Sequence, residues 1–176
     1  MEPQALLDLA EILEYPAEER IAGQRAALAR LRPRAAEGSL ERLAALLEAR
    51  DPGPAQELYS RTFDSRQETA LEAGWHLYGE NYHRGRLLVV LREDLRRAGV
   101  DEQGQLPDWI PTLLRLAAVS EDGRRRDLLA GIVAPAARRI AVPLEVEDSP
   151  WAGVLALLIE ACPSTEAAGT EALGHA

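Results

Sequence analysis

Apolar residues recur at helical spacing along most of the chain, and no stretch keeps the two-residue alternation of a strand. In the first half the pattern predicts helices over residues 3–14 and 17–31, a third that begins near Gly38 and Ser39, and a fourth from about Pro54. Prolines at positions 16, 33 and 52 separate them. The first of these helices carries one apolar face, formed by Leu6, Leu9, Ala10 and Leu13.

The stretch 59–95 holds the strongest helix signals. Ser65 with Glu68 three residues later matches a capping box, which predicts a helix from about residue 66 to residue 78. Gly79 can adopt the left-handed conformation that ends a helix, and Asn81 can cap the next one. That next helix contains the apolar run 87–91, and a run without a polar face predicts a core helix wrapped by others.

The second half continues the helical pattern after a loop at residues 98–111. A helix is predicted from Pro111, one or two helical pieces over residues 124–140 around Pro135, and a last helix with Ser149 as its cap and Pro150 at its first position. We therefore predict an all-α fold, a single-domain bundle of about seven to nine helices. The domain is expected to span residues 1–161, and residues 162–176 are expected to form a flexible tail.

Length and cysteine content limit the class of protein. A chain of 176 residues is long enough for one self-sufficient core. Cys162 is the single cysteine, so an intramolecular disulfide and a multi-cysteine metal site are excluded, which fits a reducing cytosol. The first residues are acidic where a signal peptide would be basic, and no apolar run approaches the roughly 18 residues that span a bilayer. We expect a cytoplasmic protein without direct membrane insertion.

Charge narrows the choice of partner. The net charge is −9, and all 20 basic residues are arginines. An acidic chain binds polyanions poorly, so nucleic acid is not an expected partner. A basic peptide suits an acidic surface better.

Three residues offer a possible metal site. His76, Glu80 and His83 stand at positions i, i+4 and i+7, which would align them on an unbroken helix. Gly79 and Asn81 break the helix between them, and no fourth ligand is apparent. The chain also lacks the nucleophile-elbow, P-loop and dinucleotide-binding motifs. Metal binding and enzyme activity are therefore disfavoured, and we expect neither a metal nor a cofactor.

Two aromatic segments are candidates for peptide binding. Trp75, Tyr78 and Tyr82 either pack in the core or line a groove, since Trp and Tyr combine apolar area with a polar group. In the sequence LPDWIP at 106–111, Pro107 and Pro111 restrict the backbone around an Asp and a Trp that we expect to be exposed. This turn either binds a partner or simply starts a helix.

The order of several motifs resembles a known family. These motifs are Tyr59, Phe63-Asp64, His76, Gly79-Glu80, Arg84-Gly85 and LPDWIP at 106–111. In the order and spacing of these motifs, the chain resembles the NarJ branch of the NarJ/TorD/DmsD redox-enzyme maturation proteins. These are the delta-subunit chaperones of respiratory nitrate reductases and related molybdoenzymes. The resemblance covers about residues 5–160, and its most specific parts are the Arg-Gly pair and the LPD-x-x-P turn. Trp109 stands where TorD- and DmsD-like members have a histidine, which favours the NarJ branch.

The resemblance implies an all-helical, cytoplasmic, non-catalytic chaperone. Its partner would be the N-terminal region of a molybdoenzyme catalytic subunit, such as a nitrate reductase alpha subunit, held while the bis-molybdopterin guanine dinucleotide cofactor is inserted and before membrane attachment or export. Alternatives are a small helical metal-dependent enzyme and a helical adaptor for an unrelated client; the oligomeric state, monomer or dimer, stays open. The candidate client-peptide residues are Trp75, His76, Tyr78, Glu80, Tyr82, His83, Arg84, Asp108 and Trp109.

Overall fold

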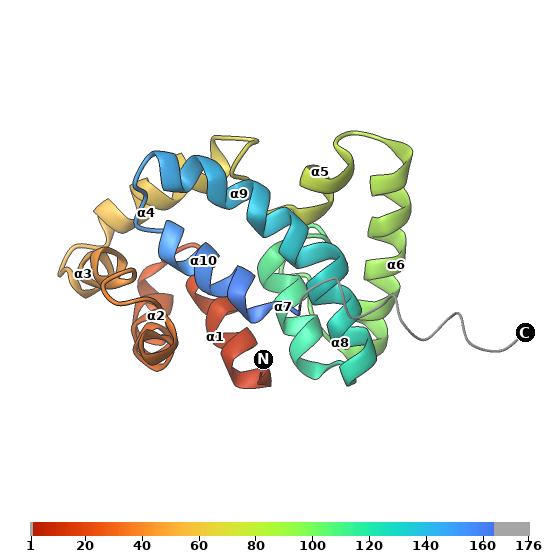
Figure 1. Cartoon of the computed structure of the whole chain (residues 1–176), viewed down its shortest axis with the longest axis horizontal. Helices are drawn as coiled ribbons and strands as arrows, with labels where there is room; N and C mark the ends of the chain where they lie inside the picture. The colour runs from red at the N-terminus through yellow and green to blue at the C-terminus, as the bar shows by residue number, and fades with distance from the viewer. Residues whose placement is uncertain (1, 164–176) are drawn as a thin grey trace, which may run out of the picture.

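Ten α-helices and three short 3-10 or π segments make up the computed structural model, which describes residues 2–163 (Figure 1). The helices are α1 Pro3–Ile12, α2 Glu18–Leu31, α3 Glu41–Glu48, α4 Gly53–Tyr59, α5 Ala73–Tyr78, α6 Tyr82–Ala98, α7 Ile110–Val119, α8 Asp122–Leu128, α9 Ala134–Val146 and α10 Ala152–Ala161. A 3-10 turn, Arg32–Arg34, follows α2, and a π turn, Ser60–Asp64, extends α4. A second π turn, Leu129–Val133, joins α8 to α9, so the described part of the chain has nine continuous helices. The predicted all-α fold is confirmed.

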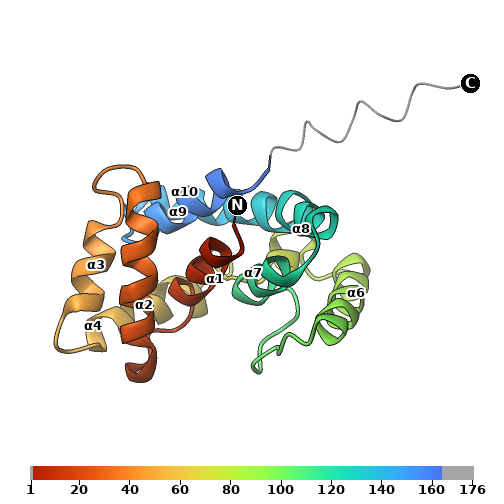
Figure 2. The same ribbon diagram turned by 90° about the horizontal axis from the view of Figure 1, so that it is seen from below.

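Helix α1 lies at the centre of the molecule. It packs between α2 and α7, and α10 packs along α9 (Figures 1 and 2). The predicted apolar face of α1 is confirmed, since Leu6, Leu9 and Leu13 are completely buried. Arg30 of α2 adds an ion pair to the buried carboxylate of Asp8 on α1, with 2.7 Å between Nη2 and Oδ1.

The predicted helix over residues 66–78 is wrong in its first half. Helix α5 begins only at Ala73, and residues 65–72 form turns. Ser65 does not cap a helix: its hydroxyl donates to the Ser60 carbonyl at 3.0 Å, while Thr69 donates to the Thr62 carbonyl. These side chains bond back to the preceding π turn and offer the backbone an alternative to a helix start.

Gly79 ends α5 and Asn81 caps α6, as predicted, although the ψ of −153° places Gly79 outside the left-handed helical region that was expected. Gly79 has φ +62°, and the Asn81 side chain accepts hydrogen bonds from the backbone N–H groups of His83 and Arg84 at 2.8 and 3.4 Å. The core position predicted for α6 is wrong. Only Leu91 and Leu95 of this helix are buried, because α6 lies at an edge of the molecule and packs on its inner side alone (Figure 1).

The last helices agree with the sequence pattern except at their boundaries. The break near Pro135 is the π turn just before it, and α10 begins at Ala152, two residues after Pro150. The Ser149 hydroxyl still accepts a hydrogen bond from the Trp151 N–H at 3.3 Å. Residues 164–176, most of the predicted tail, lie outside the described residues, so the tail stays a prediction. Within the described part, no helix is both long and apolar enough to cross a membrane.

Candidate functional site

A cavity of about 640 Å³ opens where five segments of the chain meet. These segments are the end of α1, the π turn after α4, the turns at residues 65–72, the α5–α6 region and the loop before α7. We call this cavity the cleft. Its lining residues are Glu14, Tyr15, Tyr59, Phe63, Asp64, Ser65, Arg66, Gln67, Ala70, Leu71, Glu72, Trp75, Glu80, Arg84, Gln105, Leu106 and Trp109.

A cluster of aromatic rings forms one wall of the cleft. Tyr59 packs edge-to-face against Tyr15, Phe63 and Trp151, with ring centroids 5.5, 5.0 and 5.7 Å away. Its hydroxyl donates to the Leu13 carbonyl at 2.9 Å, and burial raises the pKa of this phenol well above its ordinary value. Because its partners and the hydrogen bond fix the Tyr59 ring, this wall is rigid before any ligand binds.

Residues 107–111 of the turn are buried against α5 and α6, whereas Leu106 is exposed. The expectation that Asp108 and Trp109 are exposed is wrong, since their exposed fractions are 0% and 7%. Residues 71–73 and 108–110 run antiparallel here: the Ala73 N–H donates to the Asp108 carbonyl at 2.8 Å, and the Ile110 N–H donates to the Leu71 carbonyl at 2.9 Å. These backbone bonds hold the turn against residues 71–73, so that Trp109 lines the cleft although it is only 7% exposed.

Asp108 and Arg84 connect this turn to α6. The Arg84 Nε lies 3.0 Å from Asp108 Oδ2, and its guanidinium lies 5.8 Å from the centroid of the Trp75 ring. Gly74 permits this arrangement, because a Cβ at that position would stand 2.5 Å from Asp108 Oδ2. Asp108 thus acts on the cleft through Arg84, whose side chain it holds beside Trp75.

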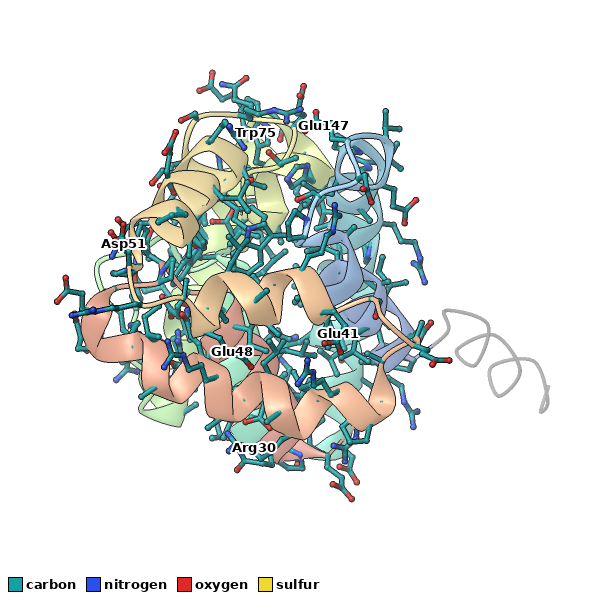
Figure 3. The ribbon with its side chains drawn as sticks, turned by 90° about the vertical axis from the view of Figure 1, so that its left-hand side faces the viewer. Arg30, Glu41, Glu48, Asp51, Trp75 and Glu147 are labelled. Atoms are coloured by element: carbon teal, nitrogen blue, oxygen red, sulfur yellow. The ribbon has the colours of Figure 1, made fainter. Side chains whose placement is uncertain are left out.

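The charges that line the cleft are mostly negative. Asp64, Glu72 and Glu80 have no ion-pair partner within residues 2–163, whereas both arginines of the lining are paired. Arg66 pairs with Glu68 and with Glu147, the latter at 2.7 Å. Figure 3 places Trp75 and Glu147 at the same end of the molecule, opposite Arg30. The cleft can therefore attract a cation, and its aromatic wall can contact an apolar group beside it.

The predicted client-binding residues fall into three groups. Trp75, Glu80, Arg84 and Trp109 line the cleft, so a role of these four in peptide binding stays a prediction. Tyr78, Tyr82 and His83 are exposed at the α5–α6 turn and do not line it. The remaining two, His76 and Asp108, do not line the cleft either; His76 is half-buried and Asp108 is fully buried.

His76 makes a structural contact. Its Nε2 lies 2.7 Å from the Ala70 carbonyl and is placed to donate to it. Burial lowers the pKa of the imidazole, although the contact to Ala70 opposes this shift. In residues 2–163, no three His, Cys, Asp or Glu side chains come together as a metal site, so the metal alternative gains no support. The Cys162 thiol is buried, which raises its pKa to about 11 and makes it a poor nucleophile.

Sequence reasoning missed part of the cleft as a binding site. Tyr15, Phe63, Asp64 and Arg66 all line it, yet they come from turns that carry no local binding motif. Phe63 and Asp64 were visible only as part of the motif order shared with the NarJ branch. Phe63 and Asp64 share the cleft with Trp75 because the chain reverses in the turns at residues 65–72. The capping-box interpretation predicted a helix over most of these residues and therefore no reversal.

Comparisons with known proteins point in the same direction as the motifs. No protein-family model matches the chain. The nitrate reductase-like protein NarX of Mycobacterium tuberculosis is 30% identical over 127 residues, which are 72% of this chain and 19% of NarX. The probable nitrate reductase molybdenum cofactor assembly chaperone NarJ of Bacillus subtilis is 30% identical over 106 residues, which are 60% of this chain and 57% of NarJ. The matches thus span about a fifth of one relative and just over half of the other. They confirm the resemblance to NarJ that the order of motifs indicates.

Proposed function

We propose that the chain is an assembly chaperone for a molybdoenzyme of the nitrate reductase type. It binds the N-terminal region of the apo catalytic subunit in the cytoplasm and holds it while the molybdenum cofactor is inserted, before membrane attachment or export. It is a binding protein and not an enzyme. The similarity to the Bacillus subtilis chaperone supports the class of client.

The observation that carries the mode of binding is the charge of the cleft. Asp64, Glu72 and Glu80 have no ion-pair partner in the described part of the chain, and they share the cleft with Tyr15 and Trp75. A peptide that mixes basic and apolar residues fits such a lining, because its cations meet the carboxylates and its apolar side chains meet the rings. A volume of about 640 Å³ accommodates a few side chains of an extended segment.

Calorimetry with a synthetic peptide tests this mode of binding. The peptide should reproduce the N-terminus of the nitrate reductase catalytic subunit from the same organism. We expect Asp64→Asn and Glu80→Gln each to weaken binding by roughly threefold to tenfold, because each removes one charge from the cleft. Asp127→Asn is the matched control, since Asp127 is exposed on α8, outside the cleft.

The function itself needs a separate measurement. The client subunit should be purified from cells with and without this chain, and its molybdenum content determined per subunit. A chaperone predicts a clear loss of molybdenum without the chain. Equal molybdenum in both preparations would reject the proposed function, whereas unchanged affinity in the cleft variants would reject only the assignment of the site.

A further inference from the structure

Helix α6 exposes a stripe of apolar and charged side chains that nothing in the described chain covers. Val89 and Val90 are 68% and 53% exposed, and Tyr82 is 75% exposed. The buried residues of the helix, Leu91 and Leu95, point to the opposite side. Both views of the fold place α6 at an edge of the molecule (Figures 1 and 2). We call this set the α6 stripe; its residues are Tyr82, Arg86, Val89, Val90, Glu93 and Arg97, and all of them are exposed except Glu93, which is half-buried.

The spacing of the α6 stripe is that of a helix-pairing seam. Tyr82, Arg86, Val89 and Glu93 follow one another at intervals of four, three and four residues. Intervals that alternate in this way keep side chains along a single line that faces a partner helix. The stripe is also continuous, since every member lies within about 100° of the others around the helix axis.

The order of charges makes the stripe complementary to itself. Its centre lies between Val89 and Val90; Arg86 stands three residues before Val89, and Glu93 stands three residues after Val90. When two such helices run antiparallel about a twofold axis through that centre, each Arg86 meets the Glu93 of the second copy. In the same way, Tyr82 stands seven residues before Val89, and Arg97 stands seven residues after Val90. An interface between identical copies requires this kind of symmetry, because residue i meets j and j meets i.

We propose that the α6 stripe is the contact surface between two copies of this chain, with α6 packed antiparallel against α6. Burial of Val89 and Val90 supplies the apolar part of the contact. Arg86 has no ion-pair partner within residues 2–163, and its guanidinium lies 6.0 Å from the Tyr82 ring centroid, so it is available to a second copy. The Glu93 side chain is 40% exposed and pairs with Arg96 and Arg97 at 2.8 and 3.1 Å. Ion pairs at a protein surface contribute little to stability, so Glu93 can give up these partners for Arg86 of a second copy at little cost.

The proposed contact is small and leaves the cleft open. One helix from each copy buries less surface than a standard interface, so the dimer should form and dissociate with concentration. Among the stripe residues, none lines the cleft. Dimer formation is therefore independent of the proposed chaperone function and is measured without a client.

Sedimentation velocity over about a hundredfold range of protein concentration tests the proposal. The parent chain is expected to pass from monomer to dimer. Arg86→Glu and Glu93→Arg should each raise the dimer dissociation constant by roughly tenfold or more, because symmetry places two like-charge contacts in each dimer. Val89→Asp should do the same, whereas Val146→Asp on α9, at a site that is 82% exposed, should not.

Combining the two charge-reversal variants tests whether Arg86 of one copy meets Glu93 of the other. An equimolar mixture of the Arg86→Glu and Glu93→Arg chains restores opposite charges at both contacts, so a mixed dimer should form, and the double variant should dimerise like the parent. Circular dichroism would verify that each variant keeps its helix content. A parent that stays monomeric over the whole range overturns the proposal, as does a mixture of the single variants that fails to recover the dimer.

Discussion

Asp108 and Arg84 form an ion pair whose two ends lie in different surroundings. The carboxylate is fully buried, while the Arg84 side chain is 16% exposed at the cleft. Asp108 Oδ1 has no hydrogen-bond partner in the described chain, so the arginine alone offsets the burial of this charge. The turn at residues 106–111 thus supports the fold first, and the cleft through it.

Replacing Asp108 should therefore lower stability. Asp108→Asn removes the charge that Arg84 neutralises, and breaking a buried pair costs about 3–5 kcal/mol when both ends are buried. Since Arg84 reaches solvent, we expect about 2–3 kcal/mol, a drop of several degrees in the melting temperature. Asp148→Asn is the control, because that carboxylate pairs with Arg42 at 2.8 Å but is 87% exposed. It should change stability by less than about 1 kcal/mol, and equal effects of the two variants would contradict the structural role of Asp108.

Helix boundaries were readable from the sequence where a single residue decides them. Gly79 and Asn81 end α5 and begin α6 as predicted, because a positive φ and a side-chain cap are local properties. The capping box at Ser65 and Glu68 failed because its residues had other partners: Ser65 bonds to Ser60, and Glu68 pairs with Arg66. Those partners depend on the π turn after α4, for which the sequence carries no recognisable signal.

The position of α6 at an edge of the molecule could not be predicted from the sequence either. A run such as residues 87–91 predicts burial, but only the packing of α7 and α5 decides which side of the helix is covered. The same limitation applied to the cleft. The residues of α5, α6 and the turn before α7 were expected at the site from motifs, whereas Tyr15 and Arg66 came to it through tertiary contacts alone.

Helix α10 requires a glycine where it crosses the loop before α3. A Cβ on Gly153 would overlap the Ser39 carbonyl, a backbone atom that cannot rotate away. Gly153→Ala should therefore push α10 off this loop and destabilise the chain by about 1–3 kcal/mol. Gly123→Ala is the matched control, because no atom lies within 4 Å of a Cβ built there on α8. It should be neutral or stabilising by up to about 1 kcal/mol, since alanine favours a helix. Chemical denaturation measures the free energy of unfolding of both variants. A neutral Gly153→Ala would show that the loop before α3 shifts to make room for the added Cβ.

The net charge of the whole molecule has the same sign as the charge of its cleft. The net charge is −9, and within the described chain the unpaired charges of the lining are the carboxylates of Asp64, Glu72 and Glu80. Long-range attraction and local pairing therefore act in the same direction on a basic peptide. The opposite holds for nucleic acid and for anionic lipid, whose negative charge is repelled at long range by the net charge of −9.

Binding of the client peptide should consequently weaken as salt rises. Exposed charges are screened beyond about 10 Å at 0.1 M salt and beyond about 3 Å at 1 M, so the electrostatic part of the affinity should fall across that range. The aromatic part should remain, because salt does not screen the burial of apolar surface. Calorimetry at the two salt concentrations measures the difference for the parent and for Asp64→Asn. The variant should lose less affinity with salt than the parent, since it has one charge fewer to screen. Equal and salt-independent affinities would mean that Tyr15, Trp75 and the other apolar residues of the cleft drive recognition without the carboxylates.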